Sequence, residues 1–201
     1  MKIAVIANNE QKEEWLYKGF NADIEIIWND VAAEADVYFD LLFERNGASF
    51  NNISYKPVFV NAVITTCKEL PDNYIRLNAW NGFLKRNIIE VAGINKEAVL
   101  KEVMNALGWN YQLTADEPGF IAARIIAMII NEAYFALQDN VSTKEAIDIA
   151  MKLGTNYPFG PFEWCNKLGL PNVYLLLKTL SINDNRYILS EKLTEELKSI
   201  A

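Results

Sequence analysis

The chain has 201 residues, of which 51% are hydrophobic and 12% aromatic, enough for one large or two small domains with packed cores. This composition excludes long disordered stretches, and a net charge of −7 without a basic stripe argues against a nucleic-acid partner. There is no histidine, and Cys67 and Cys165 lack metal-type spacing, so we expect reduced thiols and no metal site. The N-terminal apolar run, residues 1–6, is too short for a signal segment, so we expect a cytoplasmic protein.

The first part of the chain alternates short apolar runs with helical patterns. Runs rich in Val, Ile and aromatic residues predict strands at residues 2–7, 23–28, 36–43, 57–64, 75–80, 87–92 and 110–114. Helices are predicted at 10–20 and 96–107, the second with Asn95 as its N-cap and Gly108 beyond its end. Polar connections such as residues 45–55 separate these elements. The order predicts an α/β layer with helices on a mostly parallel sheet.

The second part of the chain carries only helical signals. Residues 120–137 are apolar on nearly every face, which predicts a central helix or a subunit interface. Its strongly apolar stretch contains Arg124 and is too short to span a membrane. Residues 142–145 predict a capping box for a helix at 143–153 that Gly154 closes, and further helices are expected at 161–169, 173–181 and 191–199. The predicted domains are therefore a shortened Rossmann-like α/β domain, 1–114, and an all-α domain, 115–201.

The turn after the first strand is where a dinucleotide-binding fold carries three glycines. Those glycines allow a tight turn and a close approach of the pyrophosphate to the backbone. Here the three positions hold Ala7, Asn9 and Lys12. The sequence therefore predicts no nicotinamide cofactor; a different anion held by Lys12 is the alternative.

Three segments of the second part form a specific pattern. Residues 116–124 read Asp-Glu-Pro-Gly-Phe-Ile-Ala-Ala-Arg, residues 147–154 read Ile-Asp-Ile-Ala-Met-Lys-Leu-Gly, and residues 157–163 read Tyr-Pro-Phe-Gly-Pro-Phe-Glu. In this order and spacing they resemble the C-terminal helical domain of the L-3-hydroxyacyl-CoA dehydrogenase family. The first part resembles the nucleotide-binding domain of that family in register. The resemblance implies an NAD-dependent oxidoreductase of fatty-acid metabolism that dimerises through its helical domain.

The resemblance also places the family's general base and its partner. The histidine of the family's His-Phe-Phe-Asn-Pro motif corresponds to Asn78, and the asparagine of that motif is kept as Asn81. The glutamate twelve residues after the histidine, which orients it, is kept as Glu90. Asn78 and Glu90 are therefore the catalytic positions, which we expect to be vestigial.

Two further family positions have changed. The first serine of the family's Ser-Asn-Thr-Ser stretch corresponds to Val60, and Asn61 follows it. The asparagine before the retained Arg124 is replaced by Ala123. We take Asn61 and Asn81 as candidate substrate-binding residues.

These substitutions predict that the fold is kept and the chemistry lost. An amide such as Asn78 does not titrate near neutral pH, and losing a general base typically costs about 10²–10⁴-fold in rate. We expect a homodimer without NAD binding that binds an acyl-CoA or a partner subunit. One alternative is a working dehydrogenase with a rebuilt site, in which Glu90 acts as the base. Another is a non-catalytic sensor or interaction module that uses a pocket around Asn78, Asn81 and Glu90.

Overall fold

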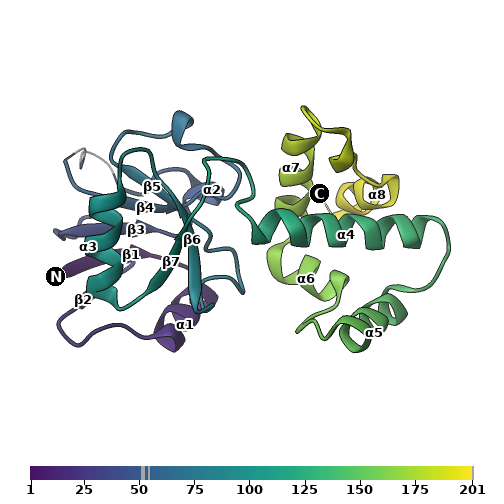
Figure 1. Ribbon diagram of the computed structural model, residues 1–201, viewed down its shortest axis with the longest axis horizontal. Helices are drawn as coiled ribbons and strands as arrows, with labels where there is room; N and C mark the ends of the chain where they lie inside the picture. The colour runs from purple at the N-terminus through teal and green to yellow at the C-terminus, as the bar shows by residue number, and fades with distance from the viewer. Residues whose placement is uncertain (51–52, 54, 201) are drawn as a thin grey trace. The chain divides into compact units, whose positions relative to one another are not determined.

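The computed structural model describes residues 1–50, 53 and 55–200 (Figure 1). Within the predicted polar connection 45–55, residues 51, 52 and 54 lie outside the described residues. The chain folds into two compact units, Met1–Phe120 and Ile121–Ala201. The first is an α/β unit and the second is helical, which confirms the predicted fold class.

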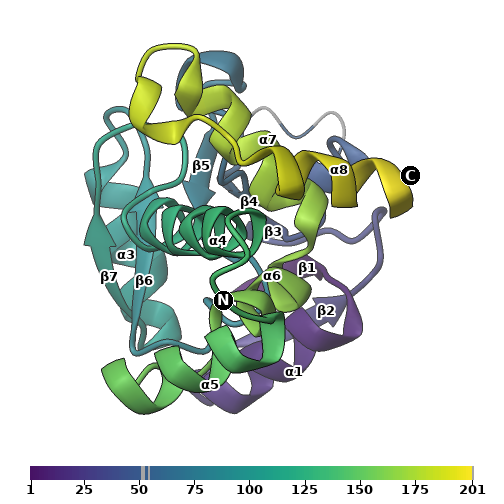
Figure 2. The same cartoon turned by 90° about the vertical axis from the view of Figure 1, so that its right-hand side faces the viewer.

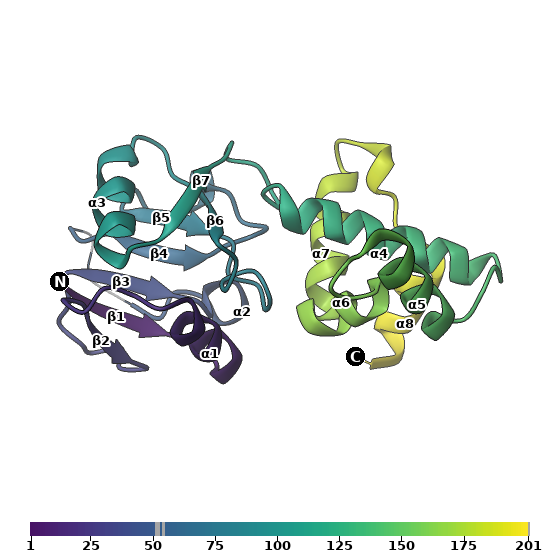
Figure 3. The ribbon, with the colours of Figure 1, turned by 60° about the horizontal axis from the view of Figure 1, so that its bottom comes forward.

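A single sheet forms the centre of the first unit (Figure 3). Its strands in the described part of the chain are β1 (Lys2–Ile6), β2 (Glu25–Trp28), β3 (Val37–Asp40), β4 (Val58–Asn61), β5 (Tyr74–Leu77), β6 (Ile88–Ala92) and β7 (Asn110–Leu113). They lie in the order β2-β1-β3-β4-β5-β6-β7. The first five are parallel, β6 runs antiparallel to β5, and β7 is parallel to β6. The strand order reverses between β1 and β3, where open α/β sheets place their ligand-binding crevice.

The two faces of this sheet are covered differently. Helices α1 (Asn9–Lys18) and α3 (Glu97–Leu107) pack on one face, where Trp15 lies edge-on to Phe39 at a centroid distance of 4.9 Å. The other face is covered by loops, by the single turn α2 (Phe43–Asn46) and by buried side chains such as Phe50 and Tyr38. In the described residues, the connections after β3 and β4 contain only the short turn α2 and the 3₁₀ turn η1 (Cys67–Glu69), so the predicted helical layer exists on one face only.

The start of helix α3 differs from the sequence prediction. Asn95 adopts a left-handed conformation with φ of 55° and is not the N-cap. Lys96 occupies that position and makes no capping hydrogen bond with its side chain. The predicted end is confirmed, because Gly108 has φ of 74° and donates its N–H to Met104 O.

Arg76 of β5 anchors the end of the first unit. Its side chain is 0% exposed, although a charged group is rarely buried without several partners. The guanidinium satisfies this requirement with donors to four oxygens: Nε to Ala62 O (2.9 Å), Nη1 to Asp116 Oδ1 (2.5 Å), and Nη2 to Val63 O (3.2 Å) and Glu117 O (3.1 Å). Two of these acceptors lie beyond the predicted domain boundary after residue 114.

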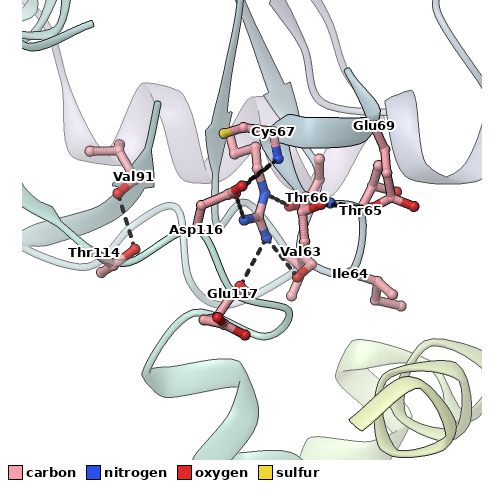
Figure 4. A network of polar contacts seen from close by, with 12 residues as sticks. Val63, Ile64, Thr65, Thr66, Cys67, Glu69, Val91, Thr114, Asp116 and Glu117 are labelled. Carbon is pink, nitrogen blue, oxygen red and sulfur yellow. Dashed lines mark hydrogen bonds and ion pairs between the residues drawn. The ribbon is translucent and has the colours of Figure 1, made fainter. Parts of the chain in front are cut away.

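Asp116 extends this network to a second loop (Figure 4). Its carboxylate accepts the backbone N–H of Cys67 at 2.8 and 3.0 Å. Burial alone would raise the pKa of Asp116, but hydrogen bonds from Cys67 and the charge of Arg76 hold it below its ordinary value. The guanidinium also lies 4.7 Å from the ring centroid of Phe120. These contacts hold residues 115–120 to the first unit, so its compact part ends at Phe120.

A long central helix organises the second unit (Figure 2). The elements are α4 (Ala122–Gln138), α5 (Lys144–Thr155), α6 (Pro161–Leu168), α7 (Leu170–Ser181), the 3₁₀ turn η2 (Asn185–Tyr187) and α8 (Glu191–Ile200). Helix α4 contacts each of the other four helices named here. The prediction of a central apolar helix is thereby confirmed.

The ends of helix α5 correct part of the prediction. Thr143 is the N-cap, and its Oγ1 accepts the N–H of Ala146 at 3.3 Å, so Glu145 is not the capping-box partner. Gly154 does not close the helix, which continues to Thr155. The left-handed residue that ends it is Asn156, with φ of 56°. Asparagine tolerates this conformation because its short polar side chain bonds locally.

The two most specific sequence blocks of the second unit meet at one cap. Asp148 of α5 is buried, and its carboxylate accepts the N–H groups of Phe162 (2.8 Å) and Glu163 (3.2 Å) at the start of α6. Gly160 lies against this carboxylate, since a Cβ there would stand 2.5 Å from Asp148 Cα. The spacing of these two blocks thus places Asp148 where it caps the N-terminus of α6.

We predict that Gly160→Ala destabilises the protein by about 1–3 kcal/mol, because the new methyl group meets backbone that the cap holds in place. The free energy of unfolding in urea measures this. Gly154→Ala is the matched control, since nothing lies within 4 Å of its Cβ position in α5. That change should be neutral or stabilise by up to about 1 kcal/mol. Equal effects of the two changes would contradict the assignment.

Candidate functional site

The carboxyl edge of the parallel strands gathers the sequence-predicted site residues. Asn61 ends β4, Asn78 follows β5, and Glu90 lies in the neighbouring β6. All three are buried, with exposures of 6%, 2% and 8%. The structure thus brings together three of the four candidates that the sequence analysis named, while Asn81 lies on the loop that follows.

Asn78 and Glu90 form a direct pair. Asn78 Nδ2 donates to Glu90 Oε2 at 3.0 Å, and Asn78 N donates to Glu90 O at 3.0 Å across the antiparallel strands. The contact is that of an amide with a carboxylate, so Asn78 is the hydrogen-bond donor toward Glu90. No proton-accepting group that titrates near neutral pH stands at position 78.

Asn61 and Asn81 make internal contacts. Asn61 Nδ2 donates to Leu41 O at 3.2 Å, and its Oδ1 accepts the N–H of Ala79 at 3.0 Å. Asn81 Nδ2 donates to Glu10 Oε2 at 2.7 Å. Asn61 therefore joins the ends of β3 and β5, and Asn81 ties the loop after β5 to helix α1.

The first turn of α1 satisfies its backbone donors with protein side chains. Ala7 N donates to Asn29 Oδ1 at 2.9 Å, Asn8 N to Gln11 Oε1 at 3.2 Å, and Gln11 N to Asn8 Oδ1 at 2.8 Å. In a dinucleotide-binding fold, the N–H groups of this turn face the pyrophosphate. Here three of them are already bonded within the chain.

The side chain of Gln11 also connects this turn to the ends of two strands. It is 3% exposed, and its Nε2 donates to Leu41 O at 2.8 Å and to Ala79 O at 3.1 Å. Leu41 follows β3 and Ala79 follows β5. One amide thus links the start of α1 with two strand ends.

Charge at this edge also disfavours an anion. Glu10 lies in the first turn of α1, where it neutralises the positive end of the helix dipole. Glu14 is buried and accepts the N–H of Gly82 at 2.5 Å. Lys12 is the residue that the sequence analysis offered as the ligand of a different anion. Its Nζ lies 5.0 Å from the ring centroid of Trp28 and so contacts an aromatic ring. A pyrophosphate here would face two carboxylates.

A further carboxylate, that of Glu44, accepts hydrogen bonds from the loop after β4. Glu44 Oε1 accepts the N–H groups of Ile64 (2.5 Å) and Thr65 (3.3 Å), and its Oε2 accepts Trp80 Nε1 at 3.1 Å. Burial raises the pKa of Glu44, and these hydrogen bonds partly oppose the rise.

Sequence reasoning missed Glu44, Gln11 and Arg76. A signal existed for Gln11, because Asn-x-x-Gln after a strand is a capping-box pattern.

The comparisons with known proteins agree with this architecture. The family model for the 3-hydroxyacyl-CoA dehydrogenase C-terminal domain matches residues 119–198. A 3-hydroxyadipyl-CoA dehydrogenase of Escherichia coli is 40% identical over 95 residues, 46% of this chain and 20% of that protein. A probable 3-hydroxybutyryl-CoA dehydrogenase of Bacillus subtilis is 28% identical over 198 residues, 92% of this chain and 68% of that protein.

Residues 119–198 thus match the 3-hydroxyacyl-CoA dehydrogenase C-terminal domain, and the whole chain is similar to members of that family. Its fold is similar to that of (S)-3-hydroxybutyryl-CoA dehydrogenase from Ralstonia eutropha, with a TM-score of 0.71 and 15% identity over 98% of this chain and 93% of the other. It spans less than half the length of some curated relatives that it matches, 20% and 45% in two of them. The activity and partners of those relatives therefore enter only as proposals.

Two positions identified in the sequence carry apolar residues. Val60 and Ala123 are both 0% exposed and contribute to the cores of their own units.

Burial raises the pKa of both thiols, Cys67 and Cys165, to about 11, and both cysteines are free. Among the described residues, no His, Cys, Asp and Glu side chains group closely enough to hold a metal. None of the described helices has the length and apolarity needed to cross a membrane.

We predict that Gln11→Glu lowers the free energy of unfolding by about 1–3 kcal/mol. The new carboxylate would face the carbonyl oxygens of Leu41 and Ala79, which lose their donor. Glu13→Gln on the exposed side of α1 makes the reverse charge change and should alter stability by less than about 0.5 kcal/mol. Urea unfolding measures both, and an unchanged Gln11→Glu variant would refute the linking role of this amide.

Proposed function

We propose that this chain has lost NAD binding and hydride transfer and that it acts by binding an acyl-CoA thioester or a partner subunit. The observation that carries the proposal is the first turn of α1. Its N–H groups at Ala7, Asn8 and Gln11 are bonded to side chains of the same unit. A pyrophosphate would have to break these bonds and approach two carboxylates, and without a nicotinamide there is no hydride acceptor.

The residue at the base position supports the same proposal. Asn78 donates to Glu90 and has no protonation equilibrium near neutral pH. The loss of a general base and the closure of the cofactor turn lie on different elements, β5 and α1. Because the base and the cofactor turn are changed independently, a single compensating substitution would not restore activity.

The second candidate function is a working 3-hydroxyacyl-CoA dehydrogenase with a rebuilt site. Two observations favour it: the family's pairing of this position with a glutamate persists as Asn78–Glu90, and both units of the fold are present. In that case Glu90 would have to take the hydroxyl proton, and a cofactor would have to displace the internal hydrogen bonds of the first turn.

The two candidates give opposite results in a cofactor titration. We predict that NADH fluorescence shows no saturable binding and that 3-hydroxybutyryl-CoA with NAD forms no NADH. Asn78→His should not restore turnover, because the base alone does not supply a hydride acceptor. An active 3-hydroxybutyryl-CoA dehydrogenase serves as the positive control. Micromolar NADH binding, or turnover by either variant, would support the working enzyme instead.

The helical unit supports the expected homodimer. Ile121 and Ile125 lie four residues apart at the start of α4, and they are 52% and 51% exposed. On α5, Ile149 and Leu153 have the same spacing and are 54% and 83% exposed. Large apolar side chains repeated on one helix face are typical of surfaces that another subunit covers.

We predict a homodimer by size-exclusion chromatography with light scattering. A lysine in place of Ile125 should weaken the dimer, because a buried charge without a partner is costly in an apolar interface. Val31→Lys is the matched control, since Val31 is 62% exposed but lies in the other unit. A monomeric wild type at micromolar concentration would contradict the proposal, and so would equal effects of the two changes.

A further inference from the structure

Strand β7 lies at one end of the sheet, so one side of its backbone has no neighbouring strand. Thr114 N donates to Val91 O at 2.9 Å, so Thr114, and Gln112 two residues before it, face β6. The alternate residues, Tyr111 and Leu113, therefore direct their N–H and C=O groups away from the sheet. Within the described part of the chain, only one of these four groups is bonded: Leu113 O accepts Gln112 Nε2 at 2.9 Å.

This edge lacks the features that usually protect an edge strand. Residues 108–115 contain no charged residue and no proline. Asn110, Gln112 and Leu113 are exposed, Leu113 to 39%, so the described residues leave the strand accessible. Natural proteins commonly guard such edges with charges, proline, bulges or a covering element. An edge without them is a template to which another strand can be added.

The opposite edge of the sheet, β2, is guarded by charge. The carboxylates of Asp23, Glu25 and Asp30 lie in or beside this strand, and the side chain of Glu25 is 68% exposed. A second copy of β2 aligned antiparallel to the first would place Asp23 of one copy opposite Asp30 of the other, which is unfavourable. Of the two edges, β7 is therefore the one at which copies of this chain, each with a net charge of −7, approach without that repulsion.

We propose that β7 pairs with β7 of a second copy of this chain, antiparallel and across a two-fold axis at Gln112. In this register Tyr111 of each copy exchanges both backbone hydrogen bonds with Leu113 of the other, so every outward backbone group of the two residues is satisfied. A contact of this kind is self-complementary and closes after two copies.

The side chains of β7 suit this register. Tyr111 packs against the core on the face that carries α1 and α3, and Leu113, two residues on, lies on the same face. Pairing therefore sets the Tyr111 ring of each copy beside the exposed Leu113 of the other. On the opposite face the two Gln112 amides meet, and each can donate to and accept from the other.

This pairing goes beyond the proposed function and uses the first unit, not the helical unit. Only the outward groups of one short strand take part, so the contact is small and the association is weak in dilute solution. The homodimer expected at micromolar concentration remains that of the helical unit.

Cysteine cross-linking of the full chain tests the pairing. In the proposed register the two copies of residue 112 form a pair without backbone hydrogen bonds, with Cα atoms about 4.5 Å apart, which suits a disulfide. The two copies of residue 110 lie roughly 14 Å apart, too far for one. Under mild oxidation at sub-millimolar concentration, we expect Gln112→Cys to give about tenfold more covalent dimer than Asn110→Cys on a non-reducing denaturing gel. The wild type, which keeps Cys67 and Cys165, gives the background.

A proline at position 113 tests the backbone hydrogen bonds themselves. Leu113→Pro removes an N–H group that points away from β6, so the sheet keeps its own ladder. Added to Gln112→Cys, it should lower the yield of covalent dimer about tenfold.

Two results would overturn the proposal: equal cross-linking at positions 110 and 112, and no cross-linking at 112 above the wild type. Both positions are exposed, so this comparison decides even if the proline variant does not fold. The denaturing gel detects only the covalent link. Its result is therefore independent of thioester binding and of the homodimer of the helical unit.

Discussion

The hydrogen bonds of the Gln11 side chain hold the start of α1 to the carboxyl ends of the parallel strands. Its oxygen accepts the N–H of Asn8, and its nitrogen reaches the carbonyls of Leu41 and Ala79. One buried amide thereby caps a helix and joins the ends of β3 and β5. Because each of these groups would be costly to leave unpaired in the interior, the contacts support one another.

This closure changes what the edge of the sheet can do. A dinucleotide-binding fold leaves the N–H groups of its first turn available and keeps negative charge away from them. Here side chains take those N–H groups, and Glu10 and Glu14 add negative charge. Among the described residues, Asn78 Oδ1 at the same edge is buried and has no hydrogen-bond partner. The carboxylates of Glu10 and Glu14 therefore make the start of α1 more negative than a helix N-terminus without acidic side chains.

The strongest family signal has a structural origin. The blocks around residues 147–154 and 157–163 meet where Asp148 caps α6 and Gly160 allows a close approach. A cap of this kind is required whether or not catalysis survives, so the helical unit can keep the pattern independently of the active site. Arg76 has a comparable role in the other unit, because it binds the segment after β7 through Asp116 and Glu117.

Local pattern determined much of this protein from sequence alone. Apolar runs located the strands, Gly108 located the end of α3, and the residues at 78 and 90 paired as the family resemblance implied. Asn95 and Gly154 were misassigned because left-handed conformations and helix ends depend on neighbours outside the local window. Only the tertiary structure decided which buried polar atoms find partners. Glu44, Gln11 and Arg76 act through residues far away in the chain, and burial gives those contacts their strength.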